Sequence, residues 1–113
     1  MIDGVNDAVI ILDKEGYVTK VNTAATILLH KGRDTVQGWK VGDLLEHNEQ
    51  LLEVYTKLEE TGQPQVLEDT FLNVAKGTTV AAISVNLYCM PICTAKGSTE
   101  ASLLVMQPIV IKR

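Results

Sequence analysis

A chain of 113 residues is long enough for a single domain that buries roughly two-thirds of the surface of its unfolded form, so it needs neither a metal nor a disulfide to fold. Ten basic and fourteen acidic side chains give a formal net charge of -4, with no basic cluster beyond the terminal Lys112-Arg113, which argues against direct binding of DNA or RNA. The apolar runs are all shorter than the roughly 20 residues of a membrane-spanning helix, which argues against membrane insertion.

The start of the chain and its two cysteines indicate the cellular compartment of the protein. Residues 1–4 carry neither the basic start nor the long apolar segment of a secretion signal, so we expect a cytoplasmic protein. Cys89 and Cys93 are too few for a disulfide framework, and a reducing compartment would keep them as thiols. Because strands are predicted near both ends, we expect residues 1–113 to be a single domain excised from a longer, multidomain protein.

The first predicted unit is a β-hairpin over residues 7–22. Residues 8–12 are apolar and rich in β-branched side chains, and residues 17–21 alternate bulky with polar side chains, so each run predicts a strand. Between them, Asp13 can accept hydrogen bonds from the turn amides, and Gly16 can adopt the positive φ that a tight reversal requires. The more apolar first strand should lie nearer the centre of a sheet.

Helices are predicted in the middle of the chain. Asn22 is a suitable N-cap for a short helix over residues 22–30 whose apolar face should lie on the sheet. A further turn or helical fragment is predicted at residues 33–38, and a short helical piece at residues 43–45. The longest helix should begin at residue 48 or 49 and run to about residue 60. Its apolar stripe consists of Leu51, Val54, Tyr55 and Leu58.

Three strands are predicted in the last part of the chain. Residues 65–74 are extended with moderate alternation, and residues 79–89 form a long strand with a clearly apolar face. Residues 90–99 are predicted to be a loop, and the last strand runs from residue 101 to about residue 111, with irregular pairing near Pro108. In the first of these strands, regular alternation places on one side Val66, Glu68, Thr70 and Leu72.

Two strands, several helices and three further strands predict an α+β domain, a five-stranded antiparallel sheet with several short helices and one longer helix packed on one face. This order resembles the PAS sensor-domain family over the whole chain. The local matches are Asp3-Gly4, Ile10-Ile11-Leu12-Asp13-Lys14-Glu15-Gly16, Val21-Asn22-Thr23-Ala24-Ala25, Gln37-Gly38-Trp39 and Asp43-Leu44-Leu45. The chain departs from the family at its end, where Met106-Gln107-Pro108-Ile109-Val110 stands in the region of a frequent Asp-Ile-Thr signature.

The resemblance implies a cupped sheet whose concave face encloses, with the helices, a small cavity. Asp13, Gly16 and Asn22 match positions that build the fold. The positions that would line the cavity are Ile11, Val21, Ala25, Leu28, Leu44, Leu51, Val54, Leu58, Phe71, Val85, Leu87 and Val105. Because this lining is aliphatic and uncharged, it favours a small apolar ligand or a closed cavity without a ligand.

Domains that the chain resembles can hold a flavin or a haem, and the residues of this chain bear on both. No cysteine occurs between Arg33 and Gly62, which argues against the flavin photochemistry of light-oxygen-voltage domains. His47 or His30 could serve as an axial haem ligand, although a solvated histidine at a helix end is the commoner situation. The sequence identifies no cofactor and no metal site, and haem or flavin stays an alternative.

The expected function is that of a sensory or regulatory module without catalytic activity of its own. Domains that the chain resembles belong to sensor histidine kinases, transcription regulators, chemoreceptors and cyclic-dinucleotide enzymes, and they commonly form homodimers. We therefore expect a homodimer attached to an output domain, with a purely structural dimerisation module or a haem- or flavin-dependent sensor as alternatives. The expected contact surface, for a second copy or for a flanking helix from outside residues 1–113, is the sheet face opposite the helices, with Val80, Ala82, Tyr88 and Ala101.

Overall fold

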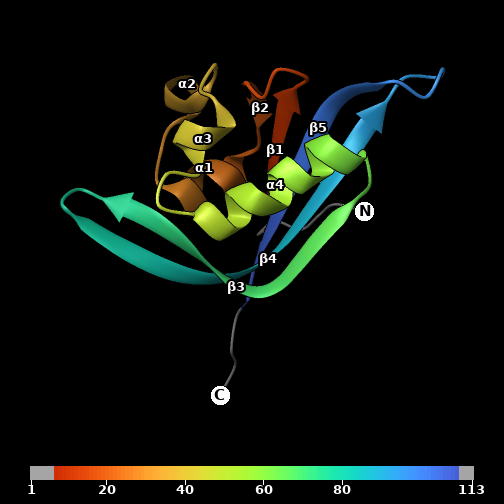
Figure 1. Ribbon diagram of the computed structural model, residues 1–113. Helices are drawn as coiled ribbons and strands as arrows, with labels where there is room; N and C mark the ends of the chain where they lie inside the picture. The colour runs from red at the N-terminus through yellow and green to blue at the C-terminus, as the bar shows by residue number, and fades with distance from the viewer. Residues whose placement is uncertain (1–6, 110–113) are drawn as a thin grey trace.

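The structure, a computed structural model, describes residues 7–109 (Figure 1). The Asp3-Gly4 pair of the resemblance, the terminal Lys112-Arg113 and the last predicted strand beyond residue 109 lie outside this range. The elements are β1 Ala8–Asp13, β2 Val18–Val21, α1 Thr23–Leu29, α2 Arg33–Val36, α3 Val41–Leu44, α4 Glu49–Thr61, β3 Gln65–Lys76, β4 Thr79–Cys93 and β5 Thr99–Pro108.

The five strands form one antiparallel sheet in the order β2-β1-β5-β4-β3. The sheet is strongly curved, and the helices lie on its concave side (Figure 1). This arrangement confirms the predicted α+β fold. Within the described residues β2 and β3 are the edge strands, so β1 lies nearer the centre than β2, as its apolar sequence predicted.

The β1–β2 turn is held by the side chain that the sequence singled out. Oδ1 of Asp13 accepts hydrogen bonds from the backbone N–H groups of Glu15 and Tyr17, at 3.0 and 2.9 Å. Gly16 adopts a φ of +87° there. Because a residue with a Cβ atom rarely adopts that conformation, the turn depends on this glycine.

Asn22 connects the hairpin to the first helix. Its Oδ1 atom accepts hydrogen bonds from the N–H of Ala25 and the N–H of Val9, both at 2.9 Å, and its Nδ2 donates to the carbonyl oxygen of Asp7 at 2.9 Å. One side chain therefore caps α1 and fixes the start of that helix against β1. The predicted helix over residues 22–30 is confirmed as α1.

The remaining helices follow the predictions with small shifts. The helical piece predicted at residues 43–45 begins two residues earlier, as α3. The predicted long helix is α4, which follows Asn48 and ends at Gly62 in a left-handed conformation. Of its predicted apolar stripe, Leu51, Tyr55 and Leu58 are buried.

Regular alternation in β3 was a wrong prediction, because the strand contains a β-bulge. The pairing with β4 shifts between Leu67 and Thr70, and Asp69 adopts a φ of +56°. The extra residue reverses the order of faces, so Thr70 and Leu72 point into the core whereas Val66 is 57% exposed. A one-residue shift moves every later side chain to the other face.

The loop predicted for residues 90–99 is also shorter than expected, because β4 continues through Met90 to Cys93. Pro91 pairs with Ser102 of β5. It is tolerated in the strand because β3 begins only at Gln65, opposite Cys89, so β4 has no neighbour on that side at Pro91.

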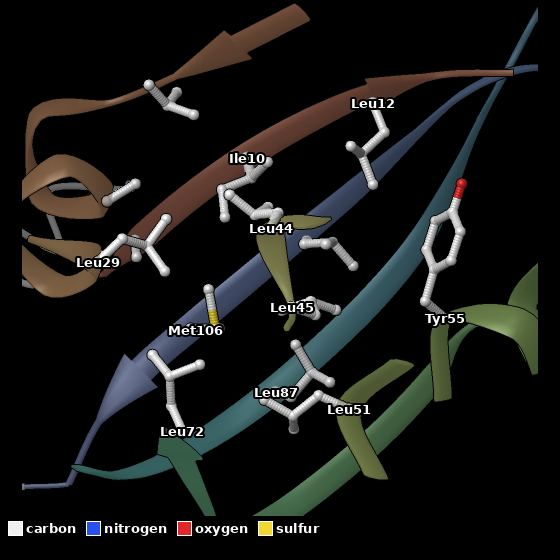
Figure 2. Packing of buried hydrophobic residues seen from close by; sticks show 14 of the residues in the cluster. Ile10, Leu12, Leu29, Leu44, Leu45, Leu51, Tyr55, Leu72, Leu87 and Met106 are labelled. Atoms are coloured by element: carbon white, nitrogen blue, oxygen red, sulfur yellow. The ribbon is translucent and has the colours of Figure 1, made fainter. Parts of the chain in front are cut away.

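The core lies between the concave face and the helices, and large side chains fill it (Figure 2). β1 and β5 contribute Ile10, Leu12 and Met106, and Leu87 and Leu72 come from β4 and β3. The helices cover these residues with Leu29, Leu44, Leu45, Leu51 and Tyr55.

Asn48, which is buried, fastens the start of α4 to the edge of the sheet. Its Oδ1 accepts a hydrogen bond from the N–H of Asn73 at 2.6 Å, and its Nδ2 donates to the carbonyl oxygens of Asn73 and Glu46, both at 3.0 Å. The side chain pairs with Asn73 of β3 as a neighbouring strand would. Its amide also satisfies backbone groups that would otherwise lie at an unpaired edge.

We predict that Asn48→Ala lowers the free energy of unfolding by about 2–4 kcal/mol, because it removes three partly buried hydrogen bonds and leaves their backbone groups without this partner. Urea denaturation followed by circular dichroism measures this loss. Asn73→Ala is the matched control, since it removes only the side-chain bond from Nδ2 to the carbonyl of His47 and should cost about 1 kcal/mol. Equal losses in the two variants would contradict this account of Asn48.

Candidate functional site

The twelve residues expected to line a cavity occupy three kinds of position. Buried in the core are Val21, Ala25, Leu44, Leu51, Leu58, Val85 and Leu87. Leu28 and Val54 are half-buried and pack against it. Ile11, Phe71 and Val105 lie on the opposite face of the sheet, and Phe71 is 62% exposed.

The strand register explains the last group. In β1 and β5, Ile11 pairs with Leu103, between the core pairs that Ile10 and Leu12 form with Leu104 and Ser102. Ile11 and Val105 therefore point away from the helices, as neighbours of core residues in a strand must.

The pockets between the helices and the core face of the sheet are small, and one of about 180 Å³ has Leu58 of α4 and Ser102 of β5 in its lining. A pocket of about 80 Å³ opens between the end of α1, α3 and β3, with Trp39, Leu44 and Val74 in its wall. Pockets that enclose a drug-sized ligand have roughly 300–1,000 Å³. As it stands, this pocket does not fit a haem or a flavin.

The two histidines lie at the ends of loops and helices. His47 borders the 80 Å³ pocket, and His30 ends α1 in a left-handed conformation; both residues are exposed. Within residues 7–109, no three side chains of the His, Cys, Asp and Glu types gather as a metal site would require.

Tyr55 carries a strongly perturbed titratable group in the core. Its side chain is 2% exposed, and its hydroxyl group hydrogen-bonds Oε2 of Glu59 at 3.2 Å. Burial, followed by the negative charge of Glu59, raises the pKa of Tyr55 to about 12. The phenol stays protonated in the physiological range and acts as a hydrogen-bonding core residue.

The two cysteines have opposite surroundings. Cys89 is fully buried in β4, and burial raises the pKa of its thiol to about 12, because a thiolate there would be desolvated. Cys93 ends the same strand and is exposed.

The outer face of the sheet, which points away from the helices, carries an apolar surface. One row across four strands consists of Val66, Tyr88, Val105 and Val9. The next row consists of Met90, Leu103 and Ile11. We call these seven residues the outer patch. All seven are half-buried or exposed.

The expected contact surface lies partly on this patch. Tyr88 belongs to it, and Ala101 lies beyond its second row, paired with Ile92. Val80 and Ala82 lie farther along β4 on the same face, toward the β3–β4 turn. Sequence reasoning missed Ile11 and Val105 as members. Each lies between two core residues of its strand, and the alternation of side chains along a strand places such a residue on the outer face.

The chain matches a known protein family over most of its length. Residues 1–109 match the PAS fold family. The chain belongs to the PAS family. No curated protein matches this chain.

Solved structures share the fold with this PAS domain at low sequence identity. A PAS domain from Colwellia psychrerythraea has a TM-score of 0.74 at 16% identity, covering 95% of this chain and 89% of that one. A sensory box sensor histidine kinase from Vibrio cholerae has a TM-score of 0.72 at 16% identity, covering 98% and 87%. The PAS domain of nitrogen regulation protein NR(II) from Vibrio parahaemolyticus has a TM-score of 0.71 at 19% identity, covering 96% and 94%.

The match to the PAS family indicates a signalling module, whereas the similarities to solved structures show the fold. PAS domains are sensory modules and generally lack catalytic activity. Among the described residues, no helix combines the length and apolar character needed to cross a membrane.

The contrast between the cysteines predicts their reactivity. In the folded protein at pH 8, 5,5′-dithiobis(2-nitrobenzoic acid) should modify Cys93 quickly and Cys89 at least about a hundred times more slowly, since the thiolate is the reactive form. After unfolding in guanidinium both thiols should react. The Cys93→Ser variant should lose the fast phase, and a fast phase that persists in it would contradict the burial of Cys89.

Proposed function

We propose that this PAS domain is the regulatory module of a signal-transduction protein, such as a sensor histidine kinase or a transcription regulator, and that two copies associate through the outer patch. The apolar outer face of the sheet carries this proposal. It supports association because seven apolar or aromatic side chains adjoin one another there, outside the core. A contiguous apolar patch of this kind commonly marks a contact surface.

The charge pattern also favours contact between two copies. Strand β4, from Thr79 to Cys93, carries no charged side chain. In a twofold-symmetric dimer the same surface faces itself, so any charge near the axis would meet a like charge. A patch crossed by an uncharged strand avoids that repulsion.

The strands offer a route from the interior to this surface. In β4, Leu87 points into the core and Tyr88 points outward, and in β5 Leu104 and Val105 do the same. A change in helix packing that shifts these strands would therefore alter the surface presented to a second copy. A signal would act by stabilising one of two packings, in proportion to its different affinity for each.

We predict that Tyr88→Glu weakens self-association at least about tenfold, because a carboxylate would be desolvated in the interface. Sedimentation velocity over a range of concentrations measures the dimer fraction. Tyr17→Glu is the matched control, since Tyr17 is an exposed tyrosine in the β1–β2 hairpin, away from the outer patch. Unchanged association of Tyr88→Glu, or equal loss in the control, would reject the outer patch as the interface.

A small ligand in the interior is the second candidate signal. The 80 Å³ pocket supports it, since Leu44 belongs both to the core and to the wall of that pocket. A ligand larger than a few atoms would have to separate α3 from β3, where Trp39 and Val74 face the pocket.

For freshly purified protein, native mass spectrometry should give the mass of a dimer without a stoichiometric ligand. An absorbance spectrum of the same sample should show no band in the visible range. A constant extra mass would instead favour the small-ligand sensor, and a visible band would favour haem or flavin. Either result would displace contact between copies as the primary signal.

A further inference from the structure

A groove of about 620 Å³ runs between the outer side of α4 and the first residues of β3. Its floor is apolar and consists of Leu52, Val54 and Leu67, all half-buried. Its remaining lining residues are Glu49, Gln50, Glu53, Thr56, Lys57 and Glu60, all exposed. The groove lies on the helix side of the sheet and shares no residue with the outer patch.

The lining of the groove is acidic. Three carboxylates and one ammonium give its lining a net charge of -2, half of the formal net charge of -4 of the whole chain. Glu68 and Asp69 follow Leu67 on β3 and are exposed as well. Carboxylates beside an apolar floor concentrate a negative potential there, which attracts cationic side chains.

The edge of β3 makes an extended peptide a poor occupant. At Asp69 the bulge interrupts the strand, and the N–H of this residue is taken by Oδ1 of Asn86 at 2.8 Å. Farther along, the Asn48 side chain occupies both backbone groups of Asn73. An added strand could not pair continuously along this edge.

We propose that the groove docks a basic amphipathic helix of a partner protein. Aliphatic side chains at helical spacing would cover Leu52, Val54 and Leu67, and flanking lysines or arginines would face Glu53 and Glu60. A helix satisfies its own backbone hydrogen bonds and therefore needs no free strand edge. Charge complementarity would give this contact its specificity and a fast association rate.

The test uses a fluorescein-labelled amphipathic peptide of leucine and lysine with leucines at positions i, i+3, i+4 and i+7. Fluorescence anisotropy at physiological salt should show saturable binding to the wild-type domain. Glu53→Lys/Glu60→Lys should weaken binding at least about tenfold, since like charges would then face each other. Leu52→Ser should also weaken it, because the floor loses apolar contact.

The matched control is Glu15→Lys/Glu100→Lys, which changes the net charge of the chain equally at exposed positions outside the groove. This variant should keep at least half of the wild-type affinity, and circular dichroism should show that all variants are folded. Equal loss in the control would mean that the peptide senses net charge alone and would overturn the proposal. Absence of binding to the wild type, or amide shifts outside α4 and β3 in a nuclear magnetic resonance titration, would overturn it as well.

Discussion

The fold depends on β5, because this strand joins two parts of the sheet that lie far apart in the sequence. It pairs with β1 from Ala8↔Met106 to Asp13↔Ala101, and on its other side with β4. Without it, the β1–β2 hairpin and the β3–β4 hairpin would be separate two-stranded units, which are marginally stable by themselves. The entropy cost of closing the long loop between β1 and β5 is offset by burial of the Leu104 and Met106 side chains, which are fully buried.

The same strand places apolar side chains on both faces. Leu104 and Met106 lie under the helices, and Leu103 and Val105 belong to the outer patch. The concave face is filled by its own helices, whereas the seven patch residues have no helix over them within residues 7–109. A sheet of this kind, apolar on both sides, is typical of strands buried on both faces. The apolar outer face therefore favours a regulatory contact outside the core.

Local signals in the sequence were sufficient for most of the fold. Asp13, Gly16 and Asn22 act within a few residues, and their hydrogen bonds and dihedral angles are as their residue types predicted. The candidate site was harder, because which face a strand residue takes depends on register. A run such as Ile10-Ile11-Leu12 is apolar throughout, so its composition does not separate core from surface. At the bulge, the N–H of Asp69 donates to the side chain of Asn86, which is seventeen residues away and gives no local signal.

The two edges of the sheet are closed by different means, and this difference limits what can bind. At β2, backbone bonds from Val18 to Trp39 and from Gly38 to Val18 cover the edge, and Nε of Arg33 donates to the carbonyl of Val21. At β3, a bulge and the Asn48 side chain interrupt the edge. Partners that extend the sheet are therefore disfavoured on both sides. Contacts with a partner through side-chain surfaces are favoured instead. The outer patch and the groove beside α4 are two such surfaces.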